Sequence, residues 1–344
     1  MKNDFSIAVV GATGAVGREV LAALYAQDVP AERVRAFGSE RSKGLEVEYG
    51  EDSLEVERAT AEAFRGIGVV LLATPAEASR TLAPAAQAAG AWVVDASSAF
   101  RSDGNVPLVL PGFNTEALGA GFTFKGRVVC LPGAVTTAVV HVVEPLRRAF
   151  GVARAQVTAM MGVSSAGVRG VSELEKQTAD LLSGREPEPQ VFPHRVGFNL
   201  VPQVGGFMVN SPWTEEEGGW TLEGARLFSA RGDVPVIAGT AVQVPTFYGH
   251  GITLNVQLKK AGPVEQVRAA LKTSPVLKVL DTPGERIYPM PMLVMSDPAV
   301  HVGRVRAFPQ APEWVTLFAA VDNASRGAAL NLVEAGFKLA ERPA

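Results

Sequence analysis

Three glycines at intervals of three residues form the first group that could do chemistry. They lie in a turn that reads Gly11, Ala12, Thr13, Gly14, Ala15, Val16 and Gly17. An apolar run at residues 5–10 precedes the turn, and apolar residues at helical spacing follow it, which predicts strand, turn and helix in succession. In that order, the first glycine permits the tight turn, the second admits a diphosphate, and the third lets the helix pack on the strand. The turn therefore predicts a dinucleotide site, with a purely structural glycine turn as the alternative.

The loop after the next expected strand, residues 34–38, indicates which dinucleotide would bind. NAD-type sites usually place an acidic residue there to bind the ribose 2′-hydroxyl. This loop instead offers hydroxyl and basic groups, and the expected cofactor ligands are Ser39, Arg41 and Ser42. Arg donates forked, charge-assisted hydrogen bonds to a phosphate, so the loop favours NADP (NADPH). The alternatives are a solvated basic loop, or a Glu40 side chain that points inward and repels a phosphate.

One thiol and four histidines are the remaining candidates for covalent or acid–base chemistry. Cys130 lies in the apolar run 128–131, just before a turn and a helix-like segment. A cysteine within a strand is expected to be buried and to behave as a small, inert apolar residue. The scattered histidines and the single cysteine leave no metal-ligand spacing, so we expect no metal site.

The elements of the first half alternate between strand and helix. Residues 68–73, 91–95 and 128–131 predict buried strands, and the Ala-rich residues 75–89 predict a helix. This alternation predicts a Rossmann-type, doubly wound parallel sheet within an α/β fold. Residues 95–101 leave the carboxyl end of a strand, where such sheets bind ligands.

The second half has different periodicities and predicts an α+β domain on a large mixed sheet. An amphipathic helix is expected over residues 168–182, and residues 185–193, with three prolines, predict a loop. Further expected strands cover 157–161, 234–244, 252–258, 302–305 and 314–321, and further helices cover 264–271 and 326–340.

Length and composition limit the possible classes of protein. The 344 residues suffice for two domains, and 47% hydrophobic with 19% charged residues is ordinary for a globular chain. A net charge of −3 without a Lys/Arg cluster argues against a nucleic-acid partner. No apolar run is long enough to cross a membrane, and we expect no signal peptide before the first strand. One cysteine fits a reducing compartment, so we expect a cytoplasmic protein.

The chain resembles the aspartate-semialdehyde dehydrogenase family in motifs spread over most of its length. The matching segments are Gly-Ala-Thr-Gly-Ala-Val-Gly at 11–17, Ser-Glu-Arg-Ser-Lys-Gly at 39–44, Ser-Ala-Phe-Arg at 98–101, Val-Pro-Leu-Val-Leu-Pro at 106–111, Ser-Ser-Ala-Gly at 164–167, Gly-His at 249–250 and Asn at 323 followed by Gly-Ala-Ala-Leu-Asn at 327–331. The resemblance implies NADPH-dependent reduction of β-aspartyl phosphate through a cysteine thioester. It also implies a dimer formed through the sheet of the second domain.

Four positions depart from the pattern that the resemblance implies. The catalytic cysteine position is Ala134, and the position of the glutamine that orients the reacting groups is Met161. The arginine that binds the substrate carboxylate is replaced by Gln243, and the lysine that binds phosphate by Gly219. Retained positions are Arg101 and Glu216 for substrate and His250 for the base. Loss of the nucleophile removes the thioester, so the chain is most similar to the cysteine-lacking USG-1-type relatives.

The resemblance predicts a dinucleotide-binding domain at residues 1–132, completed by a C-terminal helix at 326–344, and a catalytic and dimerisation domain at 133–325. Three functions remain open: a dinucleotide-binding protein without the thioester step, an active dehydrogenase with an atypical site, and a scaffold or dimerisation partner without a ligand. The expected partners are a dinucleotide and a second copy of the chain, as a homodimer or a higher oligomer.

Overall fold

The computed structural model describes residues 5–118, 126–295 and 297–341, and the chain divides into two compact units. The first unit contains residues 1–133 and 328–344, and the second contains residues 134–327. Among the described helices, none combines the length and apolar character that crossing a membrane requires.

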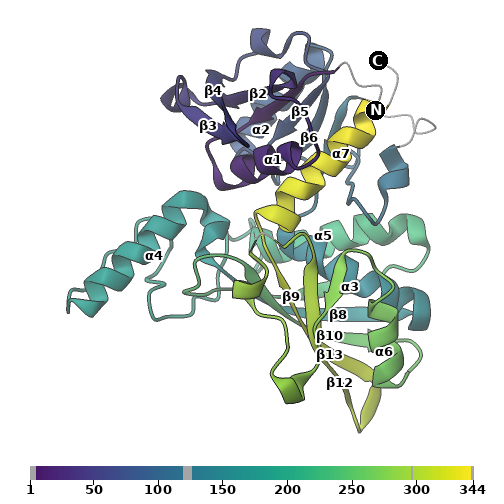
Figure 1. The fold of residues 1–344 in the computed structure, drawn as a ribbon. Coiled ribbons are helices and arrows are strands. Elements are labelled where there is room, and N and C mark those ends of the chain that lie inside the picture. The colour runs from purple at the N-terminus through teal and green to yellow at the C-terminus, as the bar shows by residue number, and fades with distance from the viewer. Residues whose placement is uncertain (1–4, 119–125, 296, 342–344) are drawn as a thin grey trace. The chain divides into compact units, whose positions relative to one another are not determined.

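A seven-stranded sheet forms the first unit (Figure 1). Its strands, in spatial order, are β3 (Glu46–Tyr49), β4 (Asp52–Arg58), β2 (Val34–Gly38), β1 (Ile7–Val10), β5 (Val69–Leu72), β6 (Trp92–Asp95) and β7 (Val128–Cys130). All neighbours are parallel except β3, which pairs antiparallel with β4 at the edge. The doubly wound α/β prediction is therefore confirmed, with one added antiparallel edge strand.

Helices cover both faces of this sheet because side chains along each strand alternate between the faces. Ile7 and Val9 of β1 join an apolar cluster that includes residues of α1 (Ala15–Tyr25) and α7 (Leu330–Ala340). Ala8 and Val10 join a second cluster that includes residues of α2 (Ala76–Ala88). Strands buried on both faces need continuous apolar runs, and that is what the sequence of these strands provides.

The order β2–β1–β5–β6 creates a topological switch point. From β1 the chain continues through α1 to β2, whereas from β5 it continues through α2, on the opposite face, to β6. The loops that follow β1 and β5 therefore diverge at the carboxyl edge of the sheet. Sheets of this kind bind ligands in the crevice that such divergence leaves.

A six-stranded mixed sheet forms the second unit (Figure 1). Its strands, in spatial order, are β11 (Leu277–Val279), β12 (Val300–Phe308), β13 (Ala311–Val321), β10 (His250–Leu258), β8 (Val152–Met161) and β9 (Val236–Gln243). The helices α3 (Ala134–Phe150), α5 (Glu215–Phe228) and α6 (Val264–Leu271) pack on it. Residues of β8 alternate between buried, as at Val157, and exposed, as at Gln156 and Thr158, so one face of the sheet is left uncovered at β8 by the described part of the chain.

The helix α4 (Gly167–Leu182) packs on short segments of the chain and not on the sheet. Its Leu174 joins Val163, Val196 and Val201 in a small apolar cluster. Short 3₁₀ turns complete the fold at Ala31–Arg33, Glu40–Ser42, Glu62–Phe64, Thr115–Leu118, Val163–Ala166, Ser229–Arg231, Pro283–Glu285 and Pro291–Leu293, and a π-helical turn at Ser325–Ala329 precedes α7.

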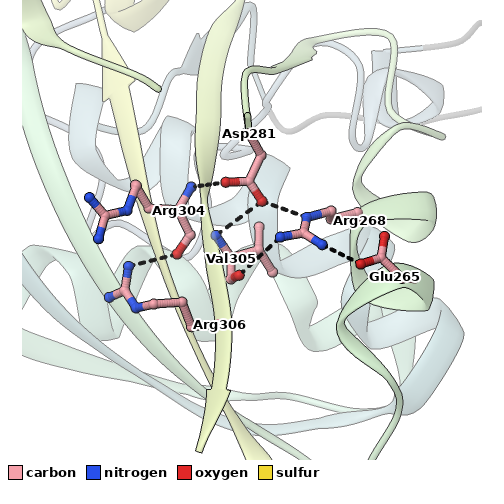
Figure 2. Close-up of polar contacts among 6 residues, drawn as sticks. All are labelled: Glu265, Arg268, Asp281, Arg304, Val305 and Arg306. Carbon is pink, nitrogen blue, oxygen red and sulfur yellow. Dashed lines mark hydrogen bonds and ion pairs between the residues drawn. The ribbon is translucent and has the colours of Figure 1, made fainter. Parts of the chain in front are cut away.

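A buried carboxylate holds a bulge in β12, where Arg304 has φ +55° (Figure 2). Asp281, whose side chain is 2% exposed, accepts hydrogen bonds from the Arg304 and Val305 amides at 2.6 and 3.3 Å. The Arg268 guanidinium of α6 donates to the same carboxylate at 2.6 Å and pairs with Glu265. Asp281 thus holds the bulge through two amide hydrogen bonds and joins it to α6 through its ion pair with Arg268.

Several elements differ from those expected from the sequence. The hairpin β3–β4, the helix α5 and the strand β11 were not predicted. The helix expected at 326–340 begins with a π-helical turn, and regular α-helix starts only at Leu330. Most expected strands were shorter than the observed ones in the second unit, whereas strand 34–38 and helix 264–271 have the predicted bounds.

Candidate functional site

Two positions in the turn after β1 require glycine, one because of its backbone conformation and both because other backbone atoms lie close by. Gly11 has φ +86°, and a Cβ atom there would lie 2.4 Å from the Ala73 carbonyl oxygen. A Cβ atom on Gly17 would lie 2.1 Å from the Gly11 carbonyl oxygen. Any side chain at either position would collide with backbone, so these two glycines allow α1 to begin directly against β1.

The N-terminus of α1 is open and suits an anion. Gly14 is its N-cap, and no side chain caps the helix. Apart from its two chain neighbours, the one atom of the described residues within 4 Å of a Cβ atom built on Gly14 would be the Gly11 carbonyl oxygen, at 3.2 Å. The uncapped N–H groups of the first turn and the space above Gly14 fit the diphosphate of a dinucleotide. Ala12 is buried beneath the turn, and Ala15, Val16 and Gly17 form the first helical turn.

The loop after β2 lies beside this turn. Ser42 Oγ is 3.4 Å from Thr13 Oγ1, so two of the expected cofactor ligands from separate segments are brought together. Ser39 begins the 3₁₀ turn Glu40–Ser42. Glu40 pairs with Arg58 at 2.9 Å, an exposed ion pair that engages the carboxylate with a cation. Arg41 is exposed, and within the described residues it forms no ion pair, so its guanidinium is available to a phosphate.

Arg101, expected to bind substrate, holds main-chain carbonyls of its own unit. Its Nε donates to the Leu131 carbonyl at 2.9 Å, and its Nη2 donates to the Ala96 carbonyl at 2.7 Å. These bonds fix the segments that leave β6 and β7. Arg101 also lowers the pKa of Asp95, whose pKa is raised overall because burial is the larger effect.

The hydrogen bonds that two hydroxyl groups make to Asp95 were not predicted from the sequence, although Ser97 lies in the segment 95–101 singled out there. Ser79 Oγ, in α2, donates to Asp95 Oδ1 at 2.6 Å and lies 2.9 Å from Thr74 Oγ1. Ser97 Oγ donates to Asp95 Oδ2 at 2.7 Å. Thr74 is the second residue after β5, and the sequence signal for this edge of the sheet was the segment 95–101, which leaves the carboxyl end of β6.

In the second unit, α3 begins at Ala134. The Ala134 methyl group lies against Gly327, where an added Cβ atom would be 2.7 Å away. Cys130, the only thiol in the chain, is fully buried in β7, and its Sγ is 3.5 Å from the Pro107 carbonyl oxygen. The start of α3 therefore carries a methyl group at the position where the motifs of the sequence led us to expect a nucleophile.

His250 is at the start of β10 and is almost wholly buried. Its Nδ1 accepts a hydrogen bond from the Gly162 amide at 3.3 Å, and in register it faces Met161 of β8. Burial lowers the pKa of His250 to about 4, while the Gly249 carbonyl and the charge of Asp322 act in the opposite direction. The imidazole is therefore neutral at physiological pH.

The side chain at position 243, where the resemblance implies an arginine that binds a carboxylate, turns toward the protein. Gln243 is buried, and its Nε2 donates to the Met161 carbonyl at 2.6 Å. Ser165 Oγ donates to its Oε1 at 3.4 Å. The amide thus joins β9 to β8 and to the 3₁₀ turn that follows β8.

The acidic residues at the start of α5 are also engaged. Glu217 forms a capping box with Thr214 and accepts a hydrogen bond from the Ala241 amide at 3.0 Å. Glu216 accepts one from Trp220 Nε1 at 3.0 Å. Gly219 lies in the next turn of the same helix. Glu216 thus bonds within its own helix, whereas His250 bonds to the Gly162 amide that follows β8.

Together, the doubly wound sheet, the glycine turn and the uncapped α1 define a dinucleotide-binding α/β protein with a second, mixed α+β unit. A family profile described as "Semialdehyde dehydrogenase, NAD binding domain" matches residues 6–120, and one described as "Semialdehyde dehydrogenase, dimerisation domain" matches residues 143–326. The chain belongs to the aspartate-semialdehyde dehydrogenase family.

Curated relatives and solved structures agree along nearly the whole chain. The aspartate-semialdehyde dehydrogenase of Aquifex aeolicus is 32% identical over 332 residues, covering 96% of each chain. That of Bacillus subtilis is 31% identical over 347 residues, covering 97% of each. Aspartate semialdehyde dehydrogenase II of Vibrio cholerae has a similar structure, with a TM-score of 0.90 at 31% identity, covering 97% of this chain and 98% of that one.

Proposed function

We propose that this chain is an NADP-binding member of its family in which the thioester reaction has been lost. One observation carries the proposal: the only thiol of the chain, Cys130, is fully buried in β7, while α3 begins with Ala134. Acyl transfer through a thioester needs an accessible thiolate, usually activated at a helix N-terminus. A methyl group cannot attack an acyl phosphate.

The environment of the other substituted positions supports the same proposal. Gln243 has no charge with which to bind a carboxylate, and its amide is bonded to Met161 and Ser165. Met161 supplies no amide, and Gly219 supplies no cation. Residues that act as a unit in catalysis fail together, so a single reversion is not expected to restore the reaction.

The cofactor half supports binding of NADP. An uncapped helix N-terminus, hydroxyls on Thr13 and Ser42, and the exposed Arg41 provide donors for a diphosphate and a 2′-phosphate. Glu40 pairs with Arg58, which answers the objection that it would repel the phosphate. When bound, the nicotinamide ring would supply hydride chemistry, and the residues named here would only hold the cofactor.

We further propose that the first unit is the cofactor domain and that the second unit carries self-association as a homodimer. Residues 196–214 contain no charged side chain, yet Phe198, Leu200, Phe207 and Val209 are exposed. A two-fold contact places a patch against its own copy, where charges of one sign would repel. Phe198 is 65% exposed, and Phe198→Asp should weaken the dimer, as measured by sedimentation. Leu222→Asp on α5 is the control and should leave the dimer unchanged.

The decisive experiment combines binding with turnover. Calorimetry should give a micromolar Kd for NADPH, and the phosphate-dependent oxidation of aspartate semialdehyde should give no turnover above background. Absence of dinucleotide binding would favour the ligand-free scaffold. Robust turnover by the native protein would refute the loss of the reaction, and its sensitivity to Cys130→Ser would then show whether this thiol acts.

Two variants extend the test. Ala134→Cys alone should remain inactive, because Met161, Gln243 and Gly219 are unchanged. Combining it with Met161→Gln, Gly219→Lys and Gln243→Arg restores all four groups and is the matched positive comparison. Activity in the single variant would mean that the other three positions matter little.

A further inference from the structure

A chain of hydrogen-bonded hydroxyls connects a buried carboxylate to the dinucleotide crevice of the first unit. It runs from Asp95, at the end of β6, through Ser79 of α2 to Thr74. Asp95 and Ser79 are fully buried, whereas Thr74 is only partly buried. The chain therefore begins in the core and ends at a position that a ligand can reach.

The directions of these hydrogen bonds follow from counting protons. A hydroxyl has one proton to donate, and an ionised carboxylate can only accept. Ser79 donates its proton to Asp95 Oδ1 at 2.6 Å. The 2.9 Å contact between Ser79 and Thr74 must then be a bond that Thr74 donates. Thr74 Oγ1 consequently has no proton left for a ligand and offers only a lone pair.

The other oxygen of Asp95 also accepts a hydrogen bond from a hydroxyl group. Ser97 Oγ donates to Oδ2 at 2.7 Å and itself accepts from the Ala99 amide at 3.1 Å. Both carboxylate oxygens are thus acceptors of hydroxyl protons. This arrangement fixes the polarity of the whole chain, because reversing it would require Asp95 to become a donor.

Thr74 lies at the switch point of the sheet, on the side away from the ribose-binding loop. Its Cγ2 would be 3.3 Å from a Cβ atom on Gly11, so it adjoins the glycine turn. The loop that holds Ser42 follows β2 on one side of β1, and Thr74 follows β5 on the other. A dinucleotide whose 2′-phosphate lies near Ser42 and whose diphosphate lies over Gly14 extends its nicotinamide half toward β5.

We propose that Thr74 is a positioning residue for the nicotinamide half of the cofactor, accepting a hydrogen bond from the carboxamide NH₂, with its polarity set by Asp95 through Ser79. The inference rests on the proposed dinucleotide function. An acceptor at this place favours a ligand that donates and disfavours one that presents a carboxylate. The buried carboxylate thereby selects the amide form of the cofactor without touching it.

The first test removes the acceptor. Thr74→Val keeps the shape of the side chain and should raise the Kd for NADPH about tenfold in calorimetry, the value of one hydrogen bond of about 1.4 kcal/mol. Binding of 2′,5′-ADP, which lacks the nicotinamide half, should stay within about twofold. An unchanged NADPH affinity would overturn the inference alone. Failure of the native protein to bind either compound would overturn the proposed function and the inference with it.

The second test reverses the polarity. Ser79→Ala leaves the Thr74 proton free to be donated, so the preference for NADP over its nicotinic acid analogue should fall by about tenfold. Ser97→Ala is the matched control, because it removes a hydroxyl from the opposite oxygen of Asp95 and should leave that preference unchanged. Equal effects of the two variants would show that Ser79 acts only through the charge or packing of Asp95. Thermal unfolding of each variant checks that the unit remains folded.

Discussion

The polar groups of the two units are used differently. At the carboxyl edge of the first sheet, the α1 N-terminus has no cap and Arg41 projects from its loop, so these donors remain available to a ligand. In the second unit, two polar side chains at positions expected from the sequence to meet substrate are bonded within the protein. Gln243 bonds to Met161 and Ser165, and Glu216 bonds to Trp220.

If the thioester reaction is lost, as proposed above, this difference indicates how the fold is kept without it. A side chain that once contacted a ligand leaves an unsatisfied buried group when the ligand is gone, and such a group costs about 1–3 kcal/mol. Substitutions that find partners inside the protein avoid this cost. Asn323, which accepts from Ser164 Oγ at 2.9 Å and from the Gly249 amide at 3.2 Å, is held in the same way.

The largest expected difference between the two units is in their stability at acid pH. Burial lowers the pKa of His250 to about 4 and that of His141 to about 3, and both lie in the second unit. Because these values are below the pKa of about 6.5 in the unfolded chain, the unfolded state binds more protons, and stability falls as pH drops from 6.5 toward 4. The loss attributable to His250 alone is roughly 3 kcal/mol.

Asp95 in the first unit should respond in the opposite direction. Burial raises its pKa, so the folded state takes up the proton first and the contribution of Asp95 to stability grows as pH falls toward its unfolded value. Hydrogen exchange measured by segment at about pH 4.5 should therefore show opening in the second unit first. Simultaneous opening of both units, or no change when His250 and His141 are each replaced by Gln, would contradict this assignment.

Breaking the carboxylate that holds the β12 bulge should destabilise the second unit by about 3 kcal/mol, because Asp281→Ala leaves Arg268 and two amides without their acceptor (Figure 2). Urea denaturation followed by circular dichroism measures the change. Glu265→Ala is the control, since Glu265 is 80% exposed and its pair with Arg268 should contribute less than about 0.5 kcal/mol. Equal effects of the two variants would show that the bulge does not depend on Asp281.

Strands buried on both faces were predictable because a continuous apolar run can be recognised in the sequence without knowing which elements pack against it. Strand β2 and helix α6 have the predicted bounds. The hairpin β3–β4 was missed because its exposed residues are mostly acidic and it is an edge of the sheet. The helix α5 was missed because Gly218 and Gly219 fall near its start, where the capping box of Thr214 and Glu217 outweighs them.

The candidate site was predictable where one segment supplies it. The glycine turn is contiguous in sequence, so its residues could be proposed as ligands directly from the sequence. The Thr74–Ser79–Asp95 chain joins a loop, a helix and a strand, and hydroxyl groups have no spacing that identifies such a partnership in advance. The pairing of Glu40 with Arg58 likewise depends on how the loop after β2 meets β4.

Blocking the phosphate approach in the first unit should weaken cofactor binding and leave the fold intact. Gly14 has an extended backbone, φ −78° and ψ 166°, that any residue can adopt. The side chain of Gly14→Val would occupy the space above the α1 N-terminus, so the Kd for NADPH should rise about 30-fold, or about 2 kcal/mol. Gly104→Val, where an added Cβ atom has open space, is the matched control. Normal binding by Gly14→Val would place the diphosphate elsewhere.

The smallest expected effect concerns the 2′-phosphate. Arg41→Ala should raise the Kd for NADPH about tenfold and leave the Kd for NADH unchanged, because only NADPH carries the group that the guanidinium would bind. Arg65→Ala removes an exposed positive charge from the same unit and controls for general electrostatics. Arg58→Ala frees Glu40 from its ion pair and should also weaken NADPH relative to NADH, since the freed carboxylate is next to Arg41 in sequence. Equal losses for both cofactors would place Arg41 at the diphosphate instead.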